Sequence, residues 1–296
     1  MSVTTLRLPG RTLEFERGTP LIMGIVNASP ESFSDGSEVA DLAAQLRRAL
    51  ALTEEGADLI DVGGESGVTG AEPLPPEEEI ERVVPLVERL AAEGIVVSVD
   101  TWKAPVAQAA LDAGAAMIND VSGLRDPLIA DACAAKGASL VIMHTRAEPK
   151  HKEFPGYDDP VADVVAFLRE RIALAAERGL AEEHIVVDPG PDFAKTPAET
   201  VEVLSRLSAL HELGRPILLA ASRKDFIGAI TGRSPRERLA GSLAAVGEGV
   251  DQGAAILRVH DVDETRQFLS VRGALRGMVK VSGDLRLDTS LRREGT

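Results

Sequence analysis

This chain is poor in the features that support several common kinds of protein. Its 296 residues include a single cysteine, Cys133, which excludes an internal disulfide. Aromatic residues make up 3% of the chain, and 32 basic residues are outnumbered by 47 acidic ones, which gives a formal net charge of -15. We therefore expect neither nucleic acid nor an anionic membrane as a partner, because both select basic surfaces.

Long apolar runs and linkers are lacking as well. No apolar run approaches the roughly 20 residues that span a bilayer, and the N-terminus has no basic stretch followed by an apolar one. These absences predict a cytoplasmic protein. No Gly/Ser-rich linker divides the main part of the chain, and a hydrophobic content of 44% is enough to fill one large core.

The chain does contain a regular alternation of apolar runs and longer mixed stretches. Eight short apolar runs each end, within a residue or two, on a polar side chain, and the stretches between them are long enough for helices. Such runs are typical of parallel strands that are buried on both faces. The runs are Leu21–Asn27, Ala57–Gly63, Ile95–Asp100, Ala116–Asp120, Ser139–His144, Ile185–Asp188, Pro216–Ser222 and Ala254–His260. Eight such units predict an α/β fold of the (βα)8 TIM barrel type.

The two ends of the chain differ from this pattern. Two short alternating segments, Thr5–Leu8 and Thr12–Phe15, flank a Pro-Gly turn and predict a β-hairpin that caps the barrel bottom. Near the C-terminus the sequence becomes charged and loses its apolar period. We therefore expect an N-terminal hairpin in residues 1–20, the barrel in residues 21–276 and a flexible tail in residues 277–296.

Polar residues at the strand ends predict the functional site. In a TIM barrel the active site forms at the C-terminal ends of the strands, so these residues would converge on one mouth. They are Asn27, Asp61, Asp100, Asn119, Asp120, His144, Asp188, Ser222 and His260. A single buried carboxylate can be a helix cap or part of an internal ion pair, but several at one edge favour a site. Their oxygens suit the amine and ring N–H groups of a heterocycle.

The last two predicted strands end on basic residues instead of acids. Ser222-Arg223-Lys224 and Arg258-Val259-His260 supply strong hydrogen-bond donors. This pair of strand ends often builds a phosphate site in barrels, and arginine binds phosphate through two parallel hydrogen bonds. The alternative is that both arginines only neutralise nearby carboxylates. The polar loop after Asn27 offers oxygen ligands compatible with a Mg²⁺ ion that also binds substrate phosphates. The histidines do not form the tight cluster of a zinc site.

Several motifs, in unbroken order from Leu21 to Ala274, resemble those of the dihydropteroate synthase family. They are Met23–Gly36, Gly56–Ser66, Ser98–Thr101, Ile118–Gly123, Val141–His144, Asp188–Gly190, Ser222–Lys224 with Phe226–Gly228, and Arg258–Asp261. The resemblance implies an enzyme of folate synthesis, a transferase that joins 4-aminobenzoate to 7,8-dihydropterin-6-ylmethyl diphosphate. The reaction releases pyrophosphate. It also implies a homodimer, because members of the family are commonly dimers.

The resemblance also implies roles for individual residues, each taken over from a matching motif position. Catalytic residues would be Asp100, Asp188, Lys224 and Arg258, and the pterin would contact Asp100, Asn119, Met143, Asp188 and Lys224. The diphosphate would contact Asn27, Arg258 and His260, with Mg²⁺ at Asn27. Aminobenzoate would lie near Phe33, Phe193 and Asp225.

The sequence departs from the family at the end that would hold aminobenzoate. Gly67-Val68-Thr69-Gly70 stands where the family has Thr-Arg-Pro-Gly, and Asp225 stands where it has serine. Arg146, Lys150 or Lys152 could replace the missing arginine. Two alternatives therefore stay open: a pterin-binding paralogue with little or no synthase activity, and a folate-dependent methyltransferase.

Overall fold

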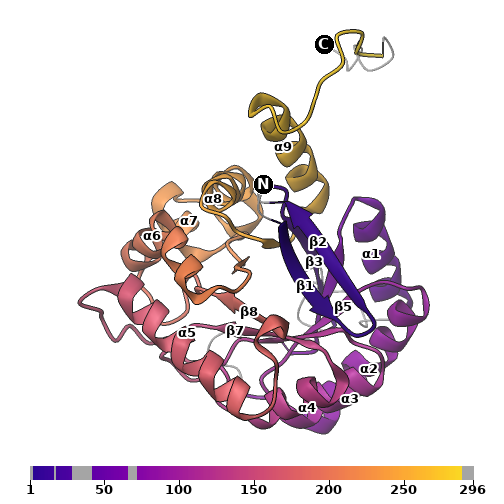
Figure 1. Ribbon diagram of the computed structural model, residues 1–296, viewed down its shortest axis with the longest axis vertical. Coiled ribbons are helices and arrows are strands. Elements are labelled where there is room, and N and C mark those ends of the chain that lie inside the picture. Colours follow the sequence, from indigo (N-terminus) through magenta and orange to yellow (C-terminus); the bar gives the residue numbers. More distant parts are fainter. Residues whose placement is uncertain (1–2, 17, 29–41, 66–71, 289–296) are drawn as a thin grey trace.

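Eight parallel strands form the centre of the fold (Figure 1). The computed structural model describes residues 3–16, 18–28, 42–65 and 72–288. The strands are β3 (Leu21–Asn27), β4 (Leu59–Gly63), β5 (Val97–Asp100), β6 (Met117–Asp120), β7 (Ser139–Met143), β8 (Ile185–Asp188), β9 (Leu218–Leu219) and β10 (Ile256–Val259). They pair in the order β8-β7-β6-β5-β4-β3-β10-β9, and a parallel bridge between Val187 and Ile217 joins the two ends of the sheet. The predicted TIM barrel is confirmed.

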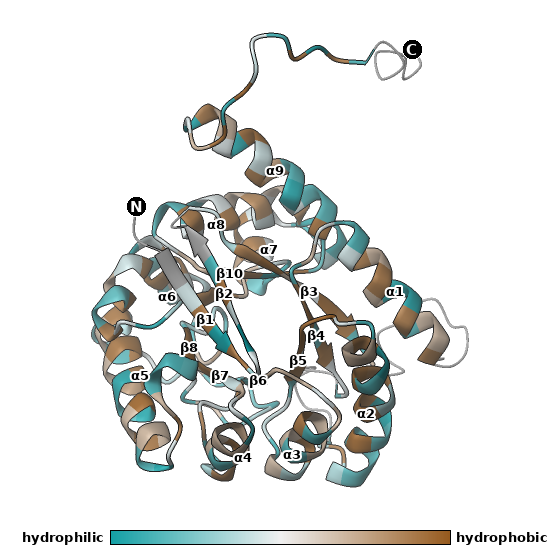
Figure 2. Ribbon diagram, turned by 45° about the vertical axis from the view of Figure 1, so that its right-hand side comes forward, coloured by the Kyte–Doolittle hydropathy of each residue, from teal (hydrophilic) through white to brown (hydrophobic). Residues whose placement is uncertain are grey.

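The strands are mostly apolar because both of their faces are buried. In β7, Leu140 and Ile142 pack toward the surrounding helices, while Val141 between them packs inside the barrel with Met23 and Val186. Successive side chains of a strand point to opposite faces, so a strand between a core and a helix layer has apolar residues at most positions. Figure 2 shows this composition as brown strands inside a ring of mixed helices.

Nine α-helices of the described residues lie around the barrel. They are α1 (Leu42–Glu54), α2 (Pro76–Ala92), α3 (Ala104–Asp112), α4 (Leu128–Lys136), α5 (Pro160–Glu177), α6 (Pro197–Ser205), α7 (Asp225–Thr231), α8 (Leu239–Asp251) and α9 (Val262–Leu275). Short 3-10 helices occur at Glu182–His184, Leu207–Leu213 and Pro235–Glu237. Local sequence fixes some starts. At α6, the Thr196 hydroxyl accepts from the N–H of Glu199 while the Glu199 carboxylate accepts from the N–H of Thr196.

The predicted hairpin is present and closes the bottom of the barrel. Strands β1 (Val3–Leu8) and β2 (Arg11–Glu16) pair antiparallel across a turn at Pro9-Gly10. Leu6 and Leu8 are buried, and they join the cluster of side chains inside the barrel. One end of the barrel is therefore filled with apolar side chains, which leaves the C-terminal strand ends as the open face.

Two features depart from the simple pattern. The seventh strand was expected over Pro216–Ser222 but β9 holds two residues, because Pro216 has no N–H to donate and the chain turns away at Arg223, whose φ is 59°. After α9, residues 276–288 form neither helix nor strand and extend away from the barrel (Figures 1 and 2). The division at residues 20 and 276 stays a prediction. None of the described helices is long and apolar enough to cross a membrane.

Candidate active site

An arginine held between two carboxylates lies at the centre of the mouth. Arg258 of β10 donates from Nε to Asp61 Oδ2 at 2.6 Å and from a terminal nitrogen to Asp100 Oδ2 at 2.9 Å. The amide of Asn119, in β6, donates to the same oxygen of Asp61 at 3.2 Å. We call these four residues, together with Asp188 at the end of β8, the floor of the mouth. All five come from strands.

Burial perturbs the acids of the floor. It raises the pKa of Asp188 to about 6, although the N–H of Gly190 donates to this carboxylate at 2.6 Å and opposes the rise. Burial also raises the pKa of Asp100, and the Arg258 guanidinium opposes it. Within the described residues, the second oxygen of the fully buried Asp61 has no hydrogen-bond donor. A buried acceptor without a partner is costly, so the floor is suited to a ligand that brings N–H groups.

Lys224 and two large side chains line the floor. Met143 ends β7, is 2% exposed and pairs in register with Asp188 of the neighbouring strand. Lys224 precedes α7, and burial lowers the pKa of its ammonium group. Its Nζ lies 4.3 Å from the centre of the Phe193 ring, which is within the range of a cation–π contact. The structure thus brings Met143 and Lys224 to the acids with which the sequence grouped them.

The residues expected at the diphosphate lie on one side of the mouth. His260 follows β10 and its Nδ1 lies 3.1 Å from the hydroxyl oxygen of Ser222. Burial lowers the pKa of His260 to about 4, with the nearby arginines acting in the same direction. Asn27 ends β3 and lies beside the end of β4. Its carboxamide oxygen is 3.8 Å from the position that a Cβ atom would take at Gly63. Arg223 is not free at this site, because it forms an ion pair with Asp261.

Two of the expected ring members are not brought to the mouth. The carboxylate of Asp120 accepts from the N–H groups of Ser122 and Leu124, both at 2.7 Å, and so holds the turn after β6. His144 is fully buried, with its ring nitrogens bonded to Lys195 and Asp163. The sequence showed that these residues end strands, but it did not show that Asp120 would be satisfied by its own loop and His144 by side chains of α5 and of the segment after β8.

Residues of two loops and of the first turn of α7 surround the floor, and we call four of them, Lys150, Lys152, Phe193 and Asp225, the rim. They line a hollow of about 270 Å³ together with Asp100 and Lys224. The Asp225 carboxylate is bonded to Lys152 and to Arg238, each at 3.1 Å, and the lysine contact holds the pKa of Asp225 below its usual range. An acid at this position is therefore neutralised within the protein.

The three candidates for the missing arginine are placed differently. Arg146 forms a two-point ion pair with Asp163 of α5, and Lys152 is taken by Asp225. Lys150, whose side chain is 5% exposed, forms an ion pair with Glu65 and donates to the carbonyl of Glu72 at 3.0 Å. Of the three, only Lys150 contacts both ends of the replaced loop. Phe33 and residues 67–70 lie outside the described residues.

A buried cluster near the rim was missed by sequence reasoning. Lys103 Nζ lies 2.5 Å from Glu65, 2.7 Å from Glu79 and 2.6 Å from the carbonyl oxygen of Leu74. It ties the end of β4 to the start of α2. No signal in the sequence distinguishes these acids from the other glutamates of this segment, since partners 24 to 38 residues apart carry no local spacing.

The remaining chemistry of the described residues is limited. No group of three or more His, Cys, Asp or Glu side chains is placed to hold a metal ion in this part of the chain. Cys133 is buried, and burial raises the pKa of its thiol to about 12, which makes it a poor nucleophile. The reactive groups of the mouth are therefore the acids, lysine and arginine of the floor and its surroundings.

Comparison with known proteins agrees with this chemistry. The family model described as pterin binding enzyme matches residues 23–260, a range that contains every residue of the floor. The chain belongs to the pterin-binding enzyme family. Within this family it is similar to the dihydropteroate synthase of Bacillus subtilis (strain 168), at 41% identity over 257 residues, which are 86% of this chain and 88% of the relative.

Solved structures of the pterin-binding enzyme family carry the same fold. Xanthomonas albilineans dihydropteroate synthase with 4-aminobenzoic acid is 46% identical, with a TM-score of 0.85 over 92% of this chain and 99% of that one. Burkholderia cenocepacia dihydropteroate synthase complexed with 7,8-dihydropteroate is 41% identical, with a TM-score of 0.85 over 94% of this chain and 99% of that one. The resemblance drawn from the motifs is confirmed.

Proposed function

We propose that this protein catalyses the dihydropteroate synthase reaction. It joins 4-aminobenzoate to 7,8-dihydropterin-6-ylmethyl diphosphate and releases 7,8-dihydropteroate and pyrophosphate. The floor carries this proposal, because buried carboxylates, an amide and an arginine meet at the mouth of a barrel whose relatives bear this name. The proposal makes the chain a transferase of folate synthesis.

The pterin ring binds at the floor. Its amine and ring N–H groups donate to Asp188 and Asn119, while Lys224 donates to a ring acceptor and Met143 packs against the ring face. These partners suit a flat heterocycle with donors along one edge, since each buried oxygen then gains a hydrogen bond. As the carbon–oxygen bond to the diphosphate breaks, the pterin methylene gains positive character, and Asp100 and Asp188 stabilise that charge.

The diphosphate binds beside Arg258 and His260. Arg258 can form two parallel hydrogen bonds to phosphate oxygens, which stabilises the charge that develops on the leaving group. The donor set also fits Mg²⁺, because this ion keeps several waters and takes few protein ligands, and Asn27 offers one carboxamide oxygen. When bound, Mg²⁺ would neutralise charge on the leaving diphosphate.

The altered rim is compatible with aminobenzoate. The arylamine attacks as a neutral nucleophile and needs little help from a base. Asp225 does not face its carboxylate alone, because Lys152 and Arg238 pair with that acid. This observation favours a working synthase over a paralogue that only binds pterin, and Phe33, Phe193 and Asp225 remain the proposed neighbours of aminobenzoate.

The decisive experiment incubates the purified protein with the pterin diphosphate, 4-aminobenzoate and Mg²⁺. We expect equal amounts of dihydropteroate and pyrophosphate, and much less of both from the Asp188→Asn variant. Pterin binding without pyrophosphate release would instead identify the binding-only paralogue. Methyl transfer from methyltetrahydrofolate to a cobalt cofactor would identify the methyltransferase.

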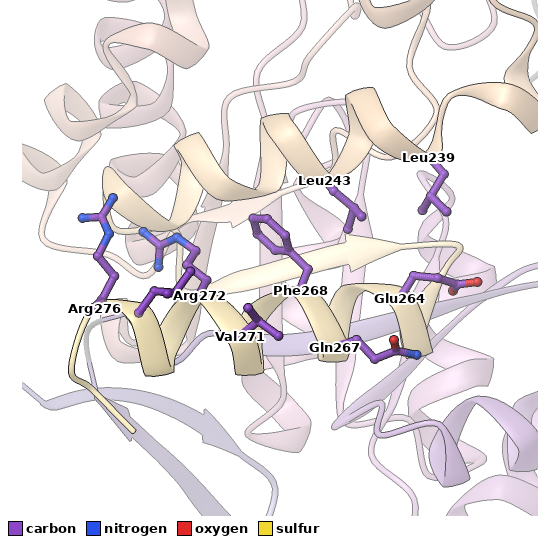
Figure 3. Close-up of a pocket in the computed structure, with 9 residues that line it drawn as sticks. Leu239, Leu243, Glu264, Gln267, Phe268, Val271, Arg272 and Arg276 are labelled. Atoms are coloured by element: carbon purple, nitrogen blue, oxygen red, sulfur yellow. The ribbon is translucent and has the colours of Figure 1, made fainter. Parts of the chain in front are cut away.

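We further propose a cytoplasmic homodimer that associates through its outer helices. Figure 3 shows Leu243 and Phe268 at a hollow of about 580 Å³ between α8 and α9. Val271 and Leu275 line the same hollow and are 61% and 83% exposed. A free buried cysteine agrees with a reducing compartment. Sedimentation equilibrium tests the dimer, and Val271→Glu should shift it toward the monomer.

A further inference from the structure

The segment between β8 and α6 holds both neighbours of Phe193 in an unfavourable backbone conformation. Asp192 has a φ of 67° and Ala194 a φ of 52°, so the residues on both sides of Phe193 adopt the left-handed region. This region disfavours every residue with a Cβ atom, alanine included. Such a conformation persists only where the surrounding structure determines it, and this often occurs at functional sites.

The Lys195 ammonium group holds this segment through hydrogen bonds to two of its carbonyl oxygens. Lys195 is 1% exposed, and its Nζ lies 3.1 Å from the Phe193 carbonyl oxygen, 3.0 Å from that of Gly190 and 2.7 Å from His144 Nδ1. An ammonium group has three hydrogens, and here each meets one acceptor. The Tyr157 hydroxyl also holds this segment, since it donates to the Ala194 carbonyl at 2.8 Å.

The neighbouring groups fix the direction of each hydrogen bond. Burial lowers the pKa of His144 to about 4, so its ring is neutral near pH 7, and His144 in turn holds the pKa of Asp163 below its usual range. The ionised Asp163 accepts from Nε2–H at 2.8 Å, which leaves Nδ1 to accept from Lys195. Burial lowers the pKa of Lys195 to about 7, while Asp188, Asp163 and Glu199 oppose this change. Lys195 Nζ forms all three of its hydrogen bonds only when it is protonated.

Phe193, whose carbonyl oxygen accepts from Lys195, lies at the site of the proposed reaction. Phe193 faces Lys224, with 4.3 Å between the ring centre and Nζ, and it lines the hollow of the rim. We propose that Lys195 is a positioning residue for the second substrate: by holding the Phe193 carbonyl it sets the place of the aromatic wall against which 4-aminobenzoate packs. This inference rests on the proposed synthase function. The inference predicts an effect on aminobenzoate and not on the pterin, because the floor that receives the pterin is held by strands and not by this segment.

The test compares Lys195→Met, which keeps the length of the side chain and removes its hydrogen bonds, with the wild type. We expect the KM for aminobenzoate to rise about tenfold or more, since small displacements of a positioning group have effects of this size. Pterin affinity, titrated directly without aminobenzoate, should stay within about twofold of the wild type. Lys136→Met is the matched control, because Lys136 pairs with Asp112 at the outer helices, and it should change neither value.

The outcomes are distinct. A folded Lys195→Met enzyme with an unchanged KM for aminobenzoate, or with only kcat lowered, overturns the inference. If this variant does not fold, Tyr157→Phe replaces it: a raised KM for aminobenzoate with unchanged pterin affinity supports the inference, and an unchanged KM overturns it. An inactive wild type overturns the proposed function itself, whereas an active wild type with insensitive variants overturns the role of Lys195 alone.

Discussion

The floor and the rim of the mouth are built from similar residue types but are held in different ways. Floor residues belong to strands, and Asp100 and Asn119 are register partners in neighbouring strands. Rim residues lie in loops or, for Asp225, at the start of α7, and the ion pair of Lys152 with Asp225 has side chains that are 49% and 63% exposed. Buried ion pairs are costly to break and exposed ones are not. Changes in the floor should therefore affect folding and pterin binding, and changes in the rim mainly affect the second substrate.

The largest effect is expected from Arg258→Ala. This change leaves the fully buried Asp61 without its charged partner, and breaking such a pair typically lowers the free energy of unfolding by about 3–5 kcal/mol. Urea denaturation measures it. Arg206→Ala is the control, since Arg206 forms exposed pairs with Asp159 and Glu202 and should cost at most about 1 kcal/mol. Equal losses in the two variants would remove the distinction between buried and exposed pairs.

Asp188→Asn should have the next largest effect. The amide keeps the size of the carboxylate but presents an N–H₂ group where the pterin needs an acceptor, so about 1–3 kcal/mol of pterin binding should be lost. That is roughly a fivefold to 150-fold weaker Kd. Calorimetric titration with a pterin measures the change. An affinity equal to that of the wild type would exclude Asp188 from the pterin site.

Pterin binding should also depend on pH through the same residue. Burial raises the pKa of Asp188 to about 6, and protonation turns one of its two acceptor oxygens into an O–H donor. Affinity should therefore be highest above pH 6 and should weaken as the pH falls through 6, because protonation removes the acceptor. In Asp188→Asn this step should disappear, and its persistence would assign the titration to another group.

The smallest effect is expected from Lys152→Ala at the rim. The free energy of unfolding should change by less than about 1 kcal/mol, because the broken ion pair with Asp225 is exposed. The KM for aminobenzoate should nevertheless rise, since Asp225 would keep only Arg238 as a cationic partner. Steady-state kinetics with Asp225→Ser as the matched variant checks this, because the serine removes the acid that Lys152 neutralises. A KM that responds to neither change would place aminobenzoate elsewhere.

The sequence predicted the floor better than the rim for a physical reason. A buried strand has an alternating or continuous apolar pattern and a definite end, so Asn27 and Asp188 could be placed at the edge of the sheet from the sequence alone. Their neighbours then follow from the order of a barrel. Asp61 was expected in the ring, but its two partners come from β6 and β10, and no local pattern reveals such contacts.

Rim and buried-loop residues were harder to place because their partners are distant in sequence. Lysine is rarely buried, so nothing in the sequence around Lys195 suggests a side chain that is 1% exposed. The pairing of Asp225 joins residues 73 positions apart, and the acid alone suggested repulsion of a benzoate. Turns with positive φ at Asp192 and Ala194 were equally hard to predict, since residues other than glycine are uncommon there.

The hairpin beneath the barrel also determines which end of the barrel small molecules can use. Leu6 and Leu8 fill the barrel at the N-terminal strand ends, and the interior above them is packed with side chains such as Met23 and Met117. A filled TIM barrel is not a pore, so small molecules cannot pass through its interior to the N-terminal end. Both substrates and both products of the proposed reaction therefore pass through the mouth at the C-terminal strand ends, so release of one pair makes room for the next.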